Sequence, residues 1–238
     1  MLEGCVQPAM LPNINAATAR VFDAAGVQLL TARRAGCCGA VRFHLNDQDG
    51  GLDDMRRNVD AWWPLMEQGV DTIVINASGC GSMIKEYGQL LADDLTYADK
   101  AARVSAAAKD IGEVLPQFEA HLLEKLAARK STARVAYHPP CSLQHGQQIR
   151  GKVESLLRAA GVDVALCADS HLCCGSAGTY SVLHKQIATQ LRDDKLAKLE
   201  ATGPERIVSA NVGCISHLQS GTATPVEHWI ELLDRMLA

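Results

Sequence analysis

The stretch Gly36-Cys37-Cys38-Gly39 organises this sequence, because Leu172-Cys173-Cys174-Gly175 repeats it. Adjacent cysteines followed by glycine are rare, so two copies indicate an internal repeat. A single cysteine precedes each pair by 32 positions, and a further cysteine follows each pair. The copies are offset by 136 positions at the first cysteine (141 − 5) and by 134 at the last (214 − 80). Eight cysteines therefore form two matching sets: Cys5, Cys37, Cys38 and Cys80, and Cys141, Cys173, Cys174 and Cys214. The ninth, Cys167, stands outside both sets.

Composition excludes several classes of protein. The 238 residues are enough for two units of about 100–120 residues each. Hydrophobic residues make up 47% but aromatic residues only 4%, so we expect aliphatic cores. A formal charge of −4 provides no excess of positive charge, so the composition does not indicate binding to nucleic acid or anionic lipid. No apolar run reaches the roughly 18–20 residues that span a bilayer, so we expect no transmembrane segment.

The N-terminal residues predict a cellular compartment. Met1 to Cys5 lacks a basic region followed by an apolar stretch, so it is not a secretory signal. In a reducing cytoplasm, cysteines more often serve as metal or redox ligands than as disulfides. Only four residues precede Cys5, where a strand is expected to end. We therefore expect a chain cut from a larger protein or started at an internal methionine.

Helix and strand patterns alternate along both copies. In the first copy, apolar periodicity predicts helices at 13–25, 52–68 and 83–91, and strands at 27–30 and 71–76. Alanine-rich helices at 98–115 and 119–129 are predicted to connect the copies. In the second copy we predict strands at 134–138, 162–166 and 206–210, and helices at 152–160, 181–201 and 226–237. The predicted division is a first repeat at 1–97, a helical connection at 98–130 and a second repeat at 131–238.

Strand and helix alternation with short loops predicts an α/β fold, with two pseudo-symmetric repeats of parallel strands flanked by helices. In such sheets, ligands gather beyond the carboxyl ends of the strands. All eight repeated cysteines lie just past predicted strand ends. Their distance along the chain is therefore compatible with convergence in space.

Four converging thiolates suit zinc or an iron–sulfur cluster. Zinc ribbons usually pair their ligands as Cys-x2–4-Cys, whereas here two ligands are adjacent. Neighbouring residues more easily bind different irons of a multinuclear cluster than two corners of one small tetrahedron, so the spacing favours iron–sulfur. A vicinal disulfide switch at Cys37-Cys38 or Cys173-Cys174 is a third interpretation. A fourth interpretation is that the cysteines are buried packing residues without metal or redox function, and this suits Cys167 best.

Five histidines stand in or near the cysteine loops. Any of them is a candidate to ligate or hydrogen-bond a cluster, although a loop histidine is more often merely solvated. These residues are His44, His138, His145, His171 and His217. Three others, His121, His184 and His228, fall on predicted helices, where we expect surface or packing roles.

At this point the sequence resembles a known family. Two blocks of cysteine, Cys-Cys-Gly and a later cysteine resemble the cysteine-rich CCG domain pair that occurs in heterodisulfide reductase and related proteins. Longer phrases resemble the glycolate oxidase iron–sulfur subunit. They are Leu2-Glu3-Gly4-Cys5-Val6-Gln7-Pro8, Ala35-Gly36-Cys37-Cys38-Gly39-Ala40, Ala77-Ser78-Gly79-Cys80-Gly81, and His138-Pro139-Pro140-Cys141.

The resemblance implies an electron-transfer subunit with up to one 4Fe-4S cluster in each repeat. Flavin-containing partner subunits would oxidise glycolate to glyoxylate, and electrons would pass to a quinone or another acceptor. This chain would then be a non-catalytic subunit of an oxidoreductase acting on 2-hydroxy acids. A cytoplasmic protein, in peripheral association with the inner face of the cell membrane, fits this role. Lactate stays open as the substrate, since specificity would reside in the flavin partner.

Two departures from the family pattern bear on this hypothesis. The general pattern ends in Cys-x-x-Cys, but Ala77 and Asn211 stand at the earlier position here. Each set therefore has four cysteines rather than five, which still suits a cubane cluster and leaves zinc open. Second, the sequence has none of the Cys-x-x-Cys-x-x-Cys runs of a ferredoxin-like region. No Gly-x-Gly-x-x-Gly follows a predicted strand either, so we expect no flavin on this chain.

Overall fold

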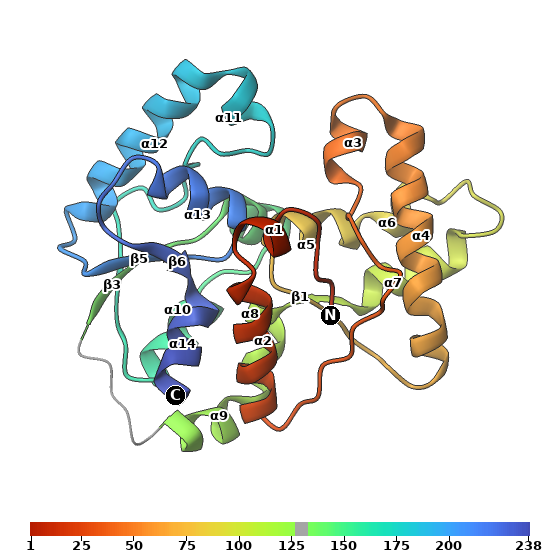
Figure 1. Cartoon of the computed structure of the whole chain (residues 1–238), viewed down its shortest axis with the longest axis horizontal. Coiled ribbons are helices and arrows are strands. Elements are labelled where there is room, and N and C mark those ends of the chain that lie inside the picture. Colours follow the sequence, from red (N-terminus) through yellow and green to blue (C-terminus); the bar gives the residue numbers. More distant parts are fainter. Residues whose placement is uncertain (127–132) are drawn as a thin grey trace.

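The computed structural model describes residues 1–126 and 133–238, which form two α/β lobes side by side (Figure 1). The first lobe has a two-stranded sheet, β1-β2, and the second a four-stranded sheet in the order β4-β3-β5-β6. Every strand pair in these sheets is parallel. The predicted α/β class with parallel strands is therefore confirmed. The end of the helix predicted at 119–129, and the predicted boundary after residue 130, lie outside the described residues.

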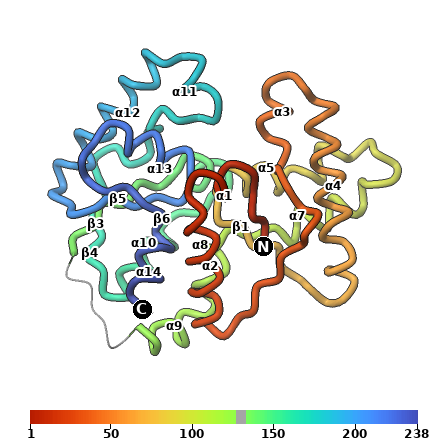
Figure 2. The backbone as a smooth tube through the Cα atoms, in the orientation of Figure 1, coloured from red at the N-terminus to blue at the C-terminus, as the bar shows by residue number. Residues whose placement is uncertain are grey.

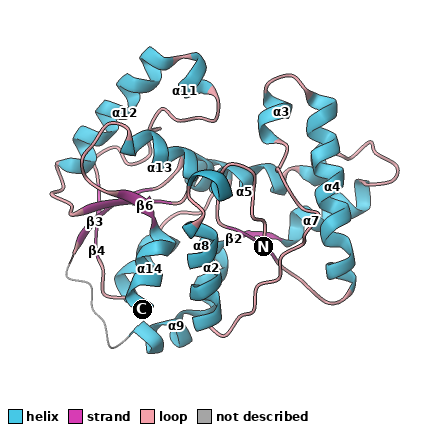
Figure 3. Cartoon of the chain, in the orientation of Figure 1, coloured by secondary structure: helices cyan, strands magenta, loops and turns pink. Residues whose placement is uncertain are grey.

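The second-lobe sheet is built around its two central strands. Its strands are β3 (Arg134–His138), β4 (Asp163–Leu166), β5 (Arg206–Ser209) and β6 (Val226–His228). β3 pairs with both β4 and β5, and its residues from Val135 to His138 are buried. Helices pack above and below the sheet (Figure 3). The helices and turns of this lobe are α10 (Lys152–Ala159), α11 (Tyr180–Leu183), α12 (Lys185–Glu200), α13 (Val212–Gln219), α14 (Trp229–Leu237) and a π turn at Ser142–Gly146.

The first lobe has a smaller sheet and more helix. β1 (Ile73–Ile75) pairs with β2 (Ala108–Asp110), with Ile73 opposite Ala108. All three residues of β1 are buried, as the apolar stretch predicted. The helices are α1 (Gln7–Met10), α2 (Asn13–Ala24), α3 (Ala40–His44), α4 (Gln48–Glu67), α5 (Ser78–Lys85), α6 (Tyr87–Leu90), α7 (Ala98–Ala107), α8 (Ile111–Val114) and α9 (Glu119–Leu126), with a 3-10 turn at Leu115–Phe118.

The strand predicted at 27–30 is not formed, and that prediction is wrong. Its counterpart in the second lobe is β4, which pairs with four residues of β3. In the first lobe, the segment that corresponds to the end of β3 is the N-terminus of the chain. It makes only isolated hydrogen bonds to its neighbours. The Met1 ammonium donates to the Leu30 carbonyl at 2.5 Å, and the Leu2 N–H donates to the Val74 carbonyl at 3.0 Å. Two such bonds keep the chain in place without building a ladder.

Two short strands lie where only helix was predicted. β2 falls within the segment at 98–130 that we expected to be helical, and β6 occupies the first three residues of the helix expected at 226–237. Strands of three residues are too short to show a period of two, so the neighbouring helical pattern hid them. Both end in a helix cap: Asp110 begins α8 and His228 begins α14, each in a capping box with a glutamate three residues on.

The first helix of the first repeat packs against the second repeat. α2, from the first repeat, packs against α14 at the C-terminus, and their side chains belong to one core that also contains the second-lobe sheet (Figure 2). Arg20 of α2 forms an ion pair with Asp234 of α14 at 2.6 Å. The corresponding helix of the second repeat, α10, packs on β4 of its own lobe and also touches α8 of the first, where a Cβ placed on Gly112 would be 2.9 Å from Val153 Cγ2.

Within the described ranges, no helix has both the length and the apolar composition that crossing a bilayer requires.

Candidate metal centres

The cysteines occupy matching positions in the two lobes. In the first lobe, Cys5 leads into α1, the pair Cys37-Cys38 leads into α3, and Cys80 is the third residue of α5. In the second lobe, Cys141 leads into the π turn, the pair precedes α11, and Cys214 is the third residue of α13. The first turn of a helix presents free N–H groups, which favour a thiolate there.

Each Cys-Cys-Gly loop is held by a glycine that no other residue replaces easily. Gly39 has φ +86°, and a Cβ there would lie 2.7 Å from the Gly51 carbonyl of α4. Gly175 has φ +88°, and its Cβ would meet the Ala188 carbonyl of α12 even more closely. The left-handed φ and the close approach both require glycine. The third residue of the motif therefore sets the loop against the following helix in the same way in both lobes.

The four thiols of the first lobe form a hydrogen-bonded string. Hydrogen bonds from the thiols of Cys38 and Cys5 lower the pKa of Cys37 to about 2. Cys38 in turn has a raised pKa because its thiol bonds to Cys37 and Cys80. The pKa of Cys80 is lowered by its bond from Cys38, and that of Cys5 is raised by its bond to Cys37. The sequence order Cys5, Cys37, Cys38, Cys80 is thus also the spatial order.

The second lobe repeats this string. Hydrogen bonds from Cys141 and Cys174 lower the pKa of Cys173 to about 2. The pKa of Cys174 is raised by its bonds to Cys173 and Cys214. Cys214 has its pKa lowered to about 5, chiefly by the bond from Cys174 and further by His138. The two sets predicted from spacing are therefore brought together in space, while Cys167 is buried outside them, with its pKa raised by burial.

Polar side chains brace the first-lobe loop. Asn58 of α4 accepts from the Gly36 N–H at 2.8 Å and donates to the Cys37 carbonyl at 2.8 Å. The buried Tyr87 hydroxyl donates to the Cys38 carbonyl at 2.8 Å and accepts from Asn58 at 3.0 Å. These contacts hold the loop by its backbone, so both thiols stay free to bind. No local sequence signal pointed to Asn58, because it adjoins no cysteine.

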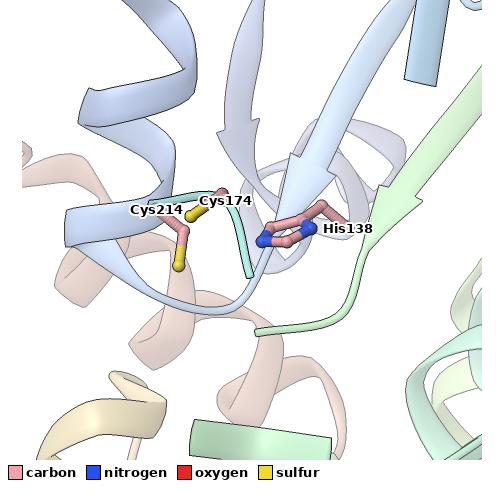
Figure 4. Close-up of side chains that lie close together, drawn as sticks. All are labelled: His138, Cys174 and Cys214. Atoms are coloured by element: carbon pink, nitrogen blue, oxygen red, sulfur yellow. The ribbon is translucent and has the colours of Figure 1, made fainter. Parts of the chain in front are cut away.

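A buried lysine and a histidine distinguish the second centre. Lys195 of α12 is only 2% exposed, and its Nζ donates to the Asp169 carbonyl at 2.8 Å. Burial lowers the pKa of Lys195, while the nearby thiol groups of Cys167 and Cys141 act in the opposite direction. His138, the last residue of β3, is fully buried beside Cys174 and Cys214 (Figure 4).

The two lobes meet where β1 and β5 end. The Ser78 N–H donates to the Ala210 carbonyl at 3.1 Å, and the Gly79 N–H donates to Asn211 Oδ1 at 3.2 Å. Asn211 also points its Nδ2 at Cys214 Sγ, 3.8 Å away. Asn211 thus links the backbone next to Cys80 with a thiol of the other lobe. Its counterpart in the first lobe, Ala77, is buried and has no polar side chain.

The other four predicted histidines lie away from the thiol strings. His44, His145 and His171 are exposed, and His217 is half-buried. His145 Nε2 lies 3.0 Å from the His171 carbonyl, and His217 Nε2 lies 3.1 Å from the Ala188 carbonyl. Among the five histidines singled out, His138 is the one that the structure places against cysteine sulfur.

The residues present fit a thiolate-ligated metal group. Each lobe offers four cysteine thiols that interact one with the next along the string, and soft thiolates select zinc, copper(I) or iron–sulfur clusters over hard ions. Backbone N–H groups already point at sulfur: Gly39 N lies 3.5 Å from Cys37 Sγ, and Gly175 N lies 3.3 Å from Cys173 Sγ. Such bonds stabilise negative charge on a ligating sulfur.

Repeated parallel lobes with matching cysteine strings define a class of cysteine-rich domain, and comparison with known families agrees. The family model of the cysteine-rich domain called CCG matches residues 1–85 and 135–219, so the chain belongs to this family and holds two copies of its domain.

Relatives with named functions narrow the comparison. The chain is 52% identical over 237 residues to the "Glycolate oxidase iron-sulfur subunit" of Escherichia coli, covering 100% of this chain and 57% of that protein. It is 29% identical over 219 residues to the "Probable glycolate oxidase iron-sulfur subunit" of Bacillus subtilis, covering 92% of this chain and 48% of that protein. "Lactate utilization protein A" of Bacillus subtilis is 26% identical over 217 residues, with 90% and 87% covered. The predicted resemblance is confirmed, and the chain spans about half the length of its glycolate oxidase relatives.

Proposed function

We propose that this chain is an electron-transfer module of a glycolate-oxidising complex, with one iron–sulfur centre in each lobe. The observation that carries the proposal is the pair of four-thiol strings, found in a chain that is 52% identical to a protein named as an iron–sulfur subunit. Cys5, Cys37, Cys38 and Cys80 would hold one centre, and Cys141, Cys173, Cys174 and Cys214 the other. A 4Fe-4S cluster at each place would accept and release one electron at a time.

The surrounding residues suit groups that change charge by one electron. The Arg57 guanidinium lies near Cys37, where it helps to lower the pKa of that thiol, and it donates to the Cys37 carbonyl at 3.2 Å. Lys195 supplies a positive charge near Cys141 in the second lobe. Fixed positive charge beside a thiolate-ligated group offsets its negative charge, which favours the reduced form.

Partners and substrate follow from the relatives' names and stay proposals. Flavin-containing subunits would oxidise glycolate, or another small 2-hydroxy acid such as lactate, and pass electrons to this chain. A quinone or another acceptor would receive them. We place the complex in the cytoplasm, in peripheral association with the inner face of the cell membrane.

A zinc-stabilised docking scaffold without redox function is the second candidate. The observation that favours it is the close trio of His138, Cys174 and Cys214, since mixed cysteine and histidine ligands are common at structural zinc sites. A heterodisulfide-type redox enzyme working through the vicinal thiols is a third, and it predicts activity that survives chelation but not alkylation.

Metal and acid-labile sulfide content of anaerobically prepared protein, with EPR after reduction, separates these functions. About four irons and four sulfides per lobe, with a signal that responds to reduction, would support electron transfer. Zinc without sulfide, persisting after anaerobic reconstitution with iron and sulfide, would instead establish the scaffold.

Single substitutions test the two-centre arrangement. Cys38→Ser should remove the first centre and spare the second, and Cys174→Ser should do the reverse. Cys167→Ala is the matched control, because this thiol is buried but belongs to neither string. Loss of all metal from each single variant would contradict independent centres.

A further inference from the structure

His138 is a buried side chain whose ring nitrogens face cysteine sulfur. It ends the central strand β3, and its exposed fraction is 0%. Neither Nδ1 nor Nε2 has a hydrogen-bond partner of normal geometry among the described residues. Leaving a buried polar group unsatisfied costs about 1–3 kcal/mol, so native proteins seldom do so without a functional reason.

The ring faces two cysteine sulfurs. One donor nitrogen of His138 and the Sγ atoms of Cys174 and Cys214 all lie within 4.8 Å of one another. Figure 4 shows an edge of the imidazole directed toward both side chains. A tetrahedral ion with metal–nitrogen bonds of about 2.0 Å and metal–sulfur bonds of about 2.3 Å separates its donors by roughly 3.5–3.8 Å. Closing the trio around one ion therefore needs movements of about 1 Å.

The first lobe has no donor side chain at the equivalent sequence position. The offset between the copies places Leu2 opposite His138 (138 − 136 = 2). Leu2 is 2% exposed and packs in the first-lobe core with Cys38. The cysteine strings of the two lobes otherwise match, residue by residue. The two sites therefore share their thiol arrangement, and the second site has an imidazole nitrogen in addition.

We propose that His138 takes the place of one thiolate as a metal ligand of the second centre, beside Cys174 and Cys214, while the first centre uses cysteine alone. The iron–sulfur form of this inference rests on the proposed function, but the assignment of His138 as a ligand does not. An iron–sulfur centre that takes neutral imidazole in place of thiolate has a higher reduction potential. The second centre would then lie at higher potential than the first, and electrons would move from the first lobe to the second.

Pulsed EPR of the reduced, anaerobic full-length protein tests the assignment directly. With 15N-labelled histidine, the expected result is a strong nitrogen hyperfine coupling on one of the two centres that changes from the 14N to the 15N pattern. This measurement uses the unaltered protein, so it does not depend on the folding of a variant. Two iron–sulfur signals without histidine nitrogen coupling would overturn the inference and leave the proposed function standing.

A matched pair of variants adds a second readout. His138→Gln should abolish the coupling and lower the midpoint potential of one centre in a redox titration, while the other centre keeps its potential. His217→Gln, in the same lobe but bonded to the Ala188 carbonyl, should leave coupling and both potentials unchanged. Equal potentials in the His138→Gln variant and the unaltered protein would count against a ligand role.

If the protein holds no iron or sulfide, the proposed function fails and the ligand assignment is tested with Co²⁺ alone. Tetrahedral Co²⁺ has visible bands that shift when a nitrogen ligand is lost. His138→Gln should shift the bands of one bound Co²⁺ and weaken its binding, whereas identical spectra and affinities for both proteins would overturn the assignment.

Discussion

The stability of the junction between the lobes should depend on the protonation of His228. Its ring is fully buried, Nδ1 accepts from the Ile230 N–H at 3.1 Å, and Nε2 lies 3.0 Å from the Asn76 carbonyl of the other lobe. Because Nδ1 accepts, Nε2 carries the proton and donates to that carbonyl, so both bonds require a neutral ring. Burial lowers the pKa of His228 from 6.5 to about 3.

The sign and size of the effect follow from this shift. The folded pKa lies below the unfolded one, so the neutral ring contributes stability that is present above pH 6.5 and is lost as the pH falls toward 3. Each pKa unit corresponds to about 1.4 kcal/mol. The free energy of unfolding should therefore fall by about 2 kcal/mol between pH 6.5 and pH 5 on account of this residue, and by about 5 kcal/mol in full below pH 3.

Urea unfolding under anaerobic conditions, at several values between pH 5 and pH 7.5, measures this contribution. The perturbation is His228→Asn, since asparagine can cap α14 but does not titrate. Between pH 7.5 and pH 5, the stability difference between the protein and this variant should shrink by about 2 kcal/mol, because other groups cancel in the difference. His121→Asn, at an exposed histidine, is the control and should show a nearly constant difference. A pH-independent difference for His228→Asn would refute the reasoning.

Three further outcomes are expected. Burial raises the pKa of Asp110 to about 7, so the stability that this carboxyl contributes when protonated is lost as the pH rises from 3.8 through 7. In urea titrations, Asp110→Asn should therefore be more stable relative to the unaltered protein at pH 8 than at pH 4. Gly39→Ala should lose more stability in thermal unfolding than Gly69→Ala, since both positions have positive φ but only the first meets a carbonyl; equal losses would contradict the packing argument. Tyr87→Phe should cost about 1–3 kcal/mol and weaken metal retention in the first lobe, measured by release to a chelator, while the second lobe keeps its metal.

The sequence predicted the cysteine sets more fully than the sheets that carry them. Spacing alone separated two sets of four, because a duplicated fold repeats the distance between its strand ends. Their role as ligands stays a prediction. β2 and β6 were missed because three residues cannot show a strand period. Asp110-Ile111-Gly112-Glu113 did carry a visible capping pattern, whereas histidine is an unusual cap, so His228 carried no such signal.

The local sequence does not show which of the histidines lies beside cysteine sulfur. His138 and His145 flank the same cysteine, yet one is buried at the end of a central strand and the other is exposed. The difference arises from β5, which pairs with β3 up to His138, although it lies far along the chain. Its position at the end of a predicted buried strand does distinguish His138, since the carboxyl ends of parallel strands border the region where ligands bind.

The packing of α2 against α14 joins the first and last helices of the chain in one core with the second-lobe sheet. The two lobes are therefore not independent folding units, because the second-lobe core is incomplete without a helix from the first repeat. A separate second half of this chain should then be poorly stable alone, because it would expose the apolar face that α2 covers. Mixed together, the two halves should complement one another and restore the same two-lobed fold.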